Sequence, residues 1–285
     1  MQEARPSRTA MRVAMRRAAH QIFDAPPRVL DDPLALPIVG GEAVAKLEMA
    51  PTLQRGRVAR ALRAFMAVRS RVAEDALARA VDRGVAQYVI LGAGLDTFPY
   101  RNPYPHSTLR VFEVDHPATQ AWKRRRLEAA AIAVPASVTF APVDFERQTL
   151  TDGLDAAGFN RHAPAFFSWL GVTMYLSDDA FASTLAYVAS TPAGGGLVFD
   201  YAVPRKSLGW MSRLALDAMA RRVARAGEPF RTFFDPSALR DRLLKAGFRP
   251  VEDLGPDELN ARYFTGRPDG LRVSGNLGRI ASAEI

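Results

Sequence analysis

QYVILGAGLDT, residues 87–97, contains the unbroken apolar run 88–91, which a glycine turn follows. The run suits a central parallel strand that is buried on both faces. The small residues Gly92, Ala93 and Gly94 end this strand and let the backbone approach a ligand closely. In open α/β sheets, ligands bind at the carboxyl edge, where such a turn lies. The stretch therefore predicts an α/β fold with a ligand at this edge.

An acidic residue closes the next predicted strand. The stretch LRVFEVDHP, residues 109–117, has apolar side chains on both sides of Glu113 and ends its strand at Asp115. An acid at the tip of the second strand, about 20 residues past the glycine turn, accepts hydrogen bonds from ribose hydroxyls. The spacing therefore indicates a cofactor that contains adenosine.

Two classes of cofactor fit these strands, dinucleotides and S-adenosylmethionine. A dinucleotide fingerprint requires a third glycine where this chain has Thr97, and its pyrophosphate requires a helix N-terminus directly after the turn. Here Asp96 follows the turn, and its carboxylate would repel phosphate. S-adenosylmethionine has no phosphate and carries an ammonium and a sulfonium cation, so these features favour it over NAD.

The composition excludes several kinds of site. With 285 residues and 48% apolar side chains the chain can bury a large core, which predicts one α/β domain over residues 1–285. The chain has no cysteine, so disulfides, thiolate metal sites and a thiol nucleophile are excluded. The four histidines lack metal-ligand spacing, and we expect no metal. No apolar run reaches the roughly 18 residues that a membrane span needs.

The chain is strongly basic, with a formal charge of +8 and a pI near 10.2. Such a charge is typical of nucleic-acid binding, but nearly all the basic residues are arginines, and codon bias in a GC-rich genome explains this equally well. The densest run, 123–126, lies on a predicted helix, where we interpret it as a solvated face. We therefore expect neither a nucleic-acid nor a membrane partner.

The first 20 residues are rich in arginine and amphipathic, which overlaps with the description of a transit peptide. They lack the apolar centre of a secretory signal, and apolar segments continue directly from them. We therefore interpret them as the start of a helical cap over residues 1–84 and expect a cytoplasmic protein.

Strands and helices alternate along the rest of the chain. Apolar spacing and capping residues predict helices over residues 10–23, 55–83, 118–132, 178–190, 207–226 and 236–246. Strands are predicted over residues 87–91, 109–115, 137–145, 163–176, 194–204, 248–254 and 278–285. The prolines and glycines of residues 23–41 predict an ordered loop. This order indicates a mostly parallel, doubly wound sheet, with residues 204–235 inserted as a helical lid.

Several motifs together resemble the leucine carboxyl methyltransferase family, also called the phosphatase methyltransferase and polyketide O-methyltransferase family, and especially its bacterial members. The motifs are VILGAGLDT with Tyr100-Arg101, VFEVDHP, VDF, GVTMYL and the closing GRIASA. The resemblance covers nearly the whole chain. It implies a class I S-adenosylmethionine methyltransferase fold, a Rossmann-like sheet of six parallel strands and an antiparallel seventh.

The resemblance also implies where the amino-acid part of the cofactor binds. Arg69 and Arg71 lie on the less apolar side of the predicted helix over 55–83, where solvent exposure is the common outcome. The resemblance assigns Arg71 to the methionyl carboxylate, for which the fork-shaped guanidinium is suited. Gly92 and its neighbours would contact the aminoacyl part.

The nucleoside part of the cofactor is implied to bind at the next two strands. Asp115 would bind the ribose, and Glu113 would share this role because it points to the same face of its strand. Asp144-Phe145 would border the adenine. By itself, this pair fits a turn residue and a core aromatic equally well.

One position departs from the family pattern. Leucine carboxyl methyltransferases proper have a glutamate before the glycine of the fourth-strand motif, whereas this chain has Leu170 before Gly171. We therefore do not transfer the protein-phosphatase substrate to this chain. Methyl transfer is an in-line displacement that depends mainly on positioning, so a carboxylate acceptor needs no base, whereas a hydroxyl acceptor does.

These features predict an S-adenosylmethionine-dependent O-methyltransferase that acts on a carboxylate or hydroxyl of a small, secondary-metabolite-like acceptor. Tyr175, Arg262 and Tyr263 are candidates for the acceptor pocket, and no catalytic residue is assigned. Two alternatives stay open, an NAD-dependent oxidoreductase and a non-catalytic protein that binds S-adenosylmethionine.

Overall fold

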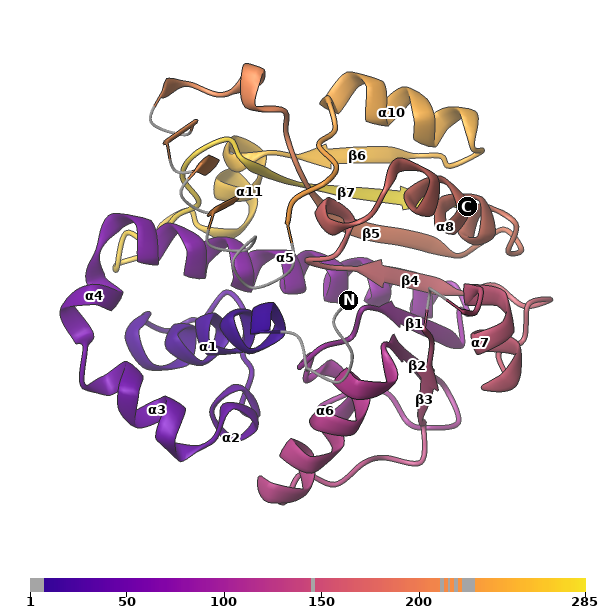
Figure 1. The fold of residues 1–285 in the computed structure, drawn as a ribbon, viewed down its shortest axis with the longest axis horizontal. Helices are drawn as coiled ribbons and strands as arrows, with labels where there is room; N and C mark the ends of the chain where they lie inside the picture. Colours follow the sequence, from indigo (N-terminus) through magenta and orange to yellow (C-terminus); the bar gives the residue numbers. More distant parts are fainter. Residues whose placement is uncertain (1–7, 145–146, 211–212, 215, 218–219, 222–228) are drawn as a thin grey trace.

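The protein is built on a seven-stranded sheet with helices on both faces (Figure 1). The computed structural model describes residues 8–144, 147–210, 213–214, 216–217, 220–221 and 229–285. The strands are β1 (Gln87–Leu91), β2 (Arg110–Asp115), β3 (Val138–Pro142), β4 (Phe166–Trp169), β5 (Gly196–Ala202), β6 (Val251–Leu254) and β7 (Gly278–Glu284). Their order is β3-β2-β1-β4-β5-β7-β6, and β7 is antiparallel to both of its neighbours. The predicted sheet of six parallel strands and an antiparallel seventh is confirmed.

The apolar run of β1 is buried on both faces, as its sequence predicts. Val89 and Leu91 belong to one core cluster, which includes residues of the helices α7 (Leu150–Ala156), α8 (Asp178–Ala189) and α10 (Pro236–Lys245). Tyr88 and Ile90 belong to a second cluster on the other face, with α5 (Arg57–Asp82) and α11 (Pro256–Tyr263). The alternation of side chains along a strand divides the core in this way.

Four helices precede α5 and gather at one edge of the sheet. They are α1 (Arg8–Phe23), α2 (Ala35–Val39), α3 (Gly41–Glu48) and α4 (Pro51–Arg55). Figure 1 shows them at the end toward which β4 points, which is the carboxyl edge. The prediction of a loop over residues 23–41 was wrong in part, because it missed α2. Pro37 is compatible with α2 because it lies in the first turn, where the backbone N–H has no helical partner.

The remaining helices complete the alternation. α6 (Pro117–Ala129) follows β2, and the N-caps Ser177 of α8 and Asp235 of α10 accept hydrogen bonds from the first turns of their helices. α7 and α11 were not predicted. Half of the predicted helix over 207–226 lies outside the described residues, and residues 210, 213–214, 216–217 and 220–221 of it are helical. The 3₁₀ turn Arg205–Ser207 precedes it. None of the helices described is long and apolar enough to cross a membrane.

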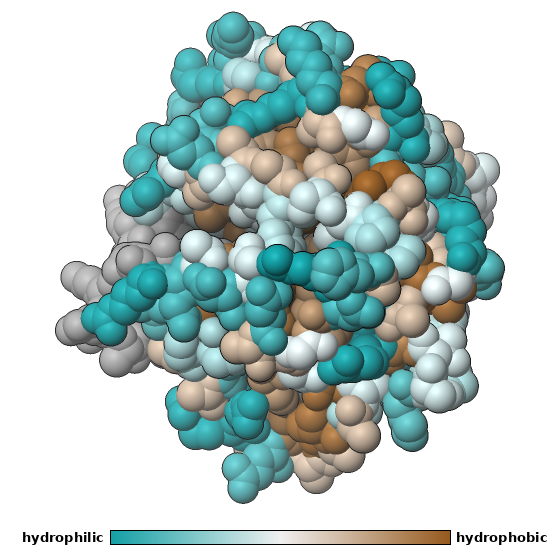
Figure 2. Space-filling model, turned by 90° about the vertical axis from the view of Figure 1, so that its right-hand side faces the viewer, coloured by the Kyte–Doolittle hydropathy of each residue, from teal (hydrophilic) through white to brown (hydrophobic). Residues whose placement is uncertain are grey.

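The face opposite the helical cap has the mixed character of an ordinary protein surface. Figure 2 shows this face with hydrophobic residues in small groups between hydrophilic ones. Such a mixture is normal, because polar surface alone cannot cover a globular protein. The features that bear on function lie at the carboxyl edge, under the cap.

Close packing at the start of β5 gives a first prediction. A Cβ atom at Gly195 would run into the backbone carbonyl of Ala165, so Gly195→Ala must displace one of two paired strands. We expect a loss of about 1–3 kcal/mol in the free energy of unfolding, which thermal unfolding measures as a lower Tm. Gly41→Ala is the matched control, because a Cβ there meets nothing within 4 Å. Equal Tm values for both variants would contradict the packing described here.

Candidate functional site

The glycine turn and the tip of β2 form one hydrogen-bonded unit. The amides of Gly92 and Ala93 donate to the carbonyl of Val114, at 2.8 and 3.1 Å. The Gly94 amide donates to Oδ2 of Asp115 at 2.6 Å, and the His116 amide donates to Oδ1 at 2.7 Å. The structure therefore brings together the glycine turn and Asp115, which the sequence predicts as neighbours in a cofactor site.

The Asp115 carboxylate lies at the solvent boundary of this edge. Its burial raises the pKa of Asp115, while the amides of Gly94 and His116 oppose the rise by donating to the ionised form. The amide of Val143, just after β3, donates to the carbonyl of Asp115 at 2.9 Å. Asp144, the next residue, therefore lies near Asp115. Phe145 lies outside the described residues, so its adenine role stays a prediction.

Glu113 has a different environment from Asp115. Its side chain is fully buried, and Oε1 accepts from Lys123 Nζ at 2.7 Å and from the Tyr100 hydroxyl at 2.9 Å. Burial raises the pKa of Glu113 even though Lys123 opposes the rise. A carboxylate enclosed in this way is not presented to a ribose, so the role expected for Glu113 does not fit. Lys123 is buried too, so the interpretation of the run 123–126 as a solvated face is wrong for this residue, whereas Arg124 and Arg125 are exposed as predicted.

Arg69, and not Arg71, faces the carboxyl edge of the sheet. Arg69 is buried, and its Nη1 donates to Asp200 Oδ2 at 2.9 Å, at the end of β5. Arg71 is 47% exposed and pairs with Asp75 one turn further along α5, at 2.7 Å. The two arginines diverge because residues two apart in an α-helix point about 200° apart. The carboxylate contact expected for Arg71 therefore does not fit its position.

The Arg69 guanidinium packs against the turn after β4. A Cβ atom on Gly171, whose φ is +74°, would lie 3.0 Å from Nη1 of Arg69. Asp200 also accepts from the Gly171 amide, and its carbonyl accepts from Thr173 Oγ1 at 2.6 Å. Nε of Arg69 is buried without a hydrogen-bond partner among the residues described. This cluster of Arg69, Asp200 and Gly171 was not predicted, since helical spacing alone did not separate Arg69 from Arg71.

The helical cap is tied to the glycine turn through buried charges. Arg17 of α1 donates to the carbonyl of Leu95 and lies 3.6 Å from Asp32. The Thr97 hydroxyl donates to Asp32 at 2.7 Å, so the residue at the position of the third glycine of a dinucleotide fingerprint binds the segment between α1 and α2. Burial opposes ionisation of Asp96, but the charges of Arg17 and Lys123 help to hold its pKa below the usual value.

The three acceptor candidates come from two segments of the chain, the turn after β4 and α11. Tyr175 lies in the 3₁₀ turn Thr173–Tyr175, and its ring packs on Phe230, with centroids 5.5 Å apart. Tyr263, at the end of α11, donates to Asp75 at 3.0 Å, and Arg262 beside it pairs with Glu252. Tyr175 lies at the carboxyl edge, and the acceptor pocket formed by these three residues stays a prediction.

Comparison with known proteins gives one family and one fold. The family model for leucine carboxyl methyltransferase matches residues 10–189. A Bacillus subtilis protein named "Putative S-adenosyl-L-methionine-dependent methyltransferase YktD" is 38% identical over 189 residues, 66% of this chain and 62% of its own. A Parafrankia protein with the same kind of name is 33% identical over 66% of this chain and 60% of its own. The chain thus spans about three fifths of the length of these curated relatives.

A solved structure from Thermobifida fusca, described as a "putative methyltransferase", superimposes with a TM-score of 0.56. It is 17% identical in sequence, and the match covers 99% of this chain and 96% of that one. Identity at this level concerns the fold alone. The arrangement of strands and helices is therefore shared along nearly the whole chain.

The buried pair of Glu113 and Lys123 gives a second prediction. Lys123→Met leaves the carboxylate buried without its cation, so we expect a loss of about 3–5 kcal/mol in urea unfolding at neutral pH. The loss should shrink as the pH falls, because protonation of Glu113 removes the unpaired charge. Adding Glu113→Gln to Lys123→Met should restore part of the stability. A Lys123→Met protein as stable as the wild type would contradict the burial of this pair.

Proposed function

Because this chain belongs to the leucine carboxyl methyltransferase family, we propose that it transfers the methyl group of S-adenosylmethionine to an oxygen atom of a small acceptor. The observation that carries the proposal is the unit formed by the glycine turn and Asp115. Its short hydrogen bonds fix a carboxylate and a half-buried turn at the carboxyl edge, where nucleoside cofactors bind in such sheets.

The charges around this edge suit the parts of S-adenosylmethionine. We assign the ribose to Asp115 and the adenine to the side of Asp144, next along the sheet. We assign the methionyl carboxylate to Arg69, since its buried Nε has no partner among the described residues and a guanidinium binds carboxylates through two parallel hydrogen bonds. The side chains of this chain bind and orient the cofactor, which supplies the methyl group.

The rival dinucleotide function is disfavoured by Asp96 and Thr97. The Asp96 carboxylate is held ionised directly after the glycine turn, where a pyrophosphate would have to lie. Thr97 is fully buried and bound to Asp32, so this position cannot open to a phosphate. An oxidoreductase that uses NAD would need both features to be different.

A small acceptor fits the distribution of charge better than nucleic acid does. Several arginines are paired with acidic residues and so present no free charge, namely Arg17, Arg63, Arg69, Arg101, Arg267 and Arg279. An electrostatic footprint for nucleic acid needs clustered free cations on one face. Methyl transfer to a carboxylate needs only a positioned nucleophile, and no base has to be assigned for it.

Transfer of a labelled methyl group tests the proposed function. We expect the purified protein to move label from S-adenosylmethionine to oxygen in a panel of small carboxylic acids and phenols. Mild alkali releases label from a methyl ester but not from an aryl ether, so the treatment identifies the acceptor group. Label found only on nitrogen or sulfur would refute the O-methyltransferase assignment. Binding of NAD, with no binding of S-adenosylmethionine, would refute the methyltransferase assignment as a whole.

The positions of the two arginines give a further prediction. Arg69→Lys keeps the charge beside Asp200 but loses the fork, so we expect S-adenosylmethionine to bind about tenfold more weakly in calorimetry. Binding of 5′-methylthioadenosine, which lacks the carboxylate, should change little. Arg71→Ala should leave both affinities within about twofold, because its partner is Asp75. If Arg71→Ala weakens the binding of S-adenosylmethionine but not that of 5′-methylthioadenosine, the methionyl carboxylate binds Arg71, as the family resemblance implies.

A further inference from the structure

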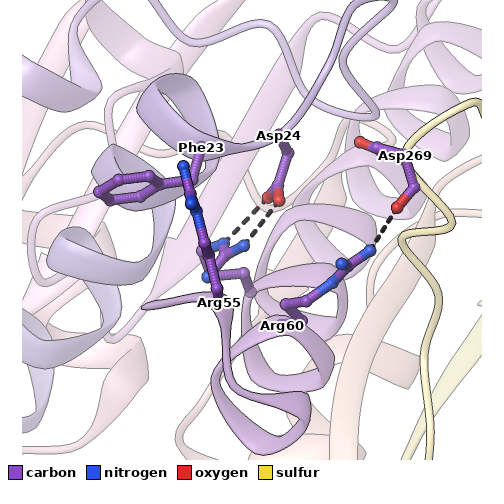
Figure 3. A pocket seen from close by; sticks show the side chains of 6 residues that line it. Phe23, Asp24, Arg55, Arg60 and Asp269 are labelled. Atoms are coloured by element: carbon purple, nitrogen blue, oxygen red, sulfur yellow. Dashed lines mark hydrogen bonds and ion pairs between the residues drawn. The ribbon is translucent and has the colours of Figure 1, made fainter. Parts of the chain in front are cut away.

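A cavity of about 190 Å³ lies where the end of α1, the junction of α4 and α5, and the loop after α11 meet. It is lined by Phe23, Asp24, Arg55, Arg60, Arg63 and Asp269 (Figure 3). Since a water molecule occupies about 30 Å³ of liquid, this space holds about six waters, enough for an oxyanion with a few carbon atoms. Five of the six side chains that line it are charged, so its electrostatics decide what it binds.

Both acidic residues of this cavity are already neutralised. Asp24 accepts from Arg63 through both of its oxygens, at 3.0 and 2.7 Å, and from His20 at 2.9 Å. Asp269 accepts from Arg267 at 3.0 and 2.6 Å, and this contact and others hold the pKa of Asp269, despite burial, at about 2. Neither carboxylate needs a cation from a ligand.

Arg55 and Arg60 supply the positive charge that is left over. Arg55 is exposed, and within the part of the chain that the structure describes it has no hydrogen-bond or ion-pair partner. Arg60 donates to the backbone carbonyl of Asp269, which is uncharged, so its own charge is not compensated. Figure 3 shows Arg55 pointing toward Phe23 and Asp24, and Arg60 pointing toward Asp269. Two unneutralised guanidinium groups therefore face one small cavity.

The cavity is distinct from the cofactor site proposed at the sheet edge. Arg60 precedes Arg69 by nine residues on α5, which is about 14 Å along the helix axis and half a turn around it. Arg69 therefore faces the ends of β4 and β5, while Arg60 faces the opposite way, toward the loop that contains Asp269.

We propose that this cavity binds a small oxyanion, a carboxylate or a phosphate group, between Arg55 and Arg60, with the Phe23 ring against the apolar part of the ligand. Guanidinium groups match both oxyanions because they can donate two parallel hydrogen bonds. Because the end of α1 and the start of α5 form walls of the cavity, occupancy stabilises the packing of α1 against α5. This site is independent of methyl transfer and is tested without the cofactor.

Titration with two probes tests the proposal. Sodium phosphate and sodium benzoate are added separately, in calorimetry and in thermal unfolding, against sodium chloride of equal ionic strength. We expect saturable binding of at least one probe and a Tm that rises with its concentration, since a ligand of the folded state stabilises it. Tighter binding of benzoate assigns the site to carboxylates, and tighter binding of phosphate assigns it to phosphate groups.

Three variants separate the cavity from general surface charge. Arg55→Gln and Arg60→Gln should each weaken binding of the probe about tenfold, as expected for a lost charge-assisted hydrogen bond. Arg57→Gln is the matched control, because Arg57 is an exposed arginine at the start of α5 that does not line the cavity. If Arg60→Gln does not fold, the exposed Arg55 carries the test alone. No saturable binding, or an equal loss in the Arg57 variant, overturns the proposal.

Discussion

Asp32 is a fully buried carboxylate on which three parts of the chain meet. Arg17 reaches it from α1, Thr97 from the turn after β1, and Arg101 from the segment after that turn, with Nε at 3.4 Å. A carboxylate removed from water is stable only while cations and donors surround it, so these contacts form together or not at all. The helical cap and the glycine turn are therefore one structure, although about 70 residues separate them in the sequence.

This coupling gives the residues after the glycine turn, Asp96 and Thr97, a structural role. In a dinucleotide fold, small residues here let a helix begin against a pyrophosphate. Here Thr97 and Asp96 turn toward the cap instead, and Asp96 accepts from the Phe98 amide at 2.9 Å while it faces Arg17. The turn is thus stabilised by internal charges and needs no anionic ligand. The same buried charges that anchor the cap make the turn suited to a cofactor without phosphate.

The strands could be predicted from the sequence because a strand that is buried on both faces is apolar at nearly every position. A run such as Tyr88–Leu91, apolar at every position, fits a strand that is covered on both faces, and β1 begins and ends close to the predicted residues. The short helices α2 and α3 were not predicted, since neither begins with a side-chain cap and both are too short to be stable without their packing on α1. The family motifs, read together, indicated the antiparallel β7.

Side-chain roles were harder to predict than the fold, for two physical reasons. Glu113 and Asp115 point to the same face of β2, but only the tip of a strand reaches the edge of the sheet. Alternation therefore could not show that Lys123 encloses Glu113. Arg69 and Arg71 are both arginines on one helix, and which of them faces the sheet depends on how α5 is rotated about its axis. That rotation is set by tertiary packing, which a window of sequence does not contain.

The departure at Leu170 has a counterpart on the neighbouring strand. The family motif places a glutamate before the glycine of this turn, whereas here the carboxylate that contacts the amide of Gly171 is Asp200, from the end of β5. Parallel pairing of β4 with β5 brings that strand end to the same edge, so an acid on either strand reaches the same region. Asp200 is shared between Gly171 and Arg69, and the pair is neutral together. If the methionyl carboxylate binds Arg69 as we propose, it meets a site whose charge is already balanced, so the hydrogen bonds of the guanidinium, rather than a net positive field, would orient the amino-acid part.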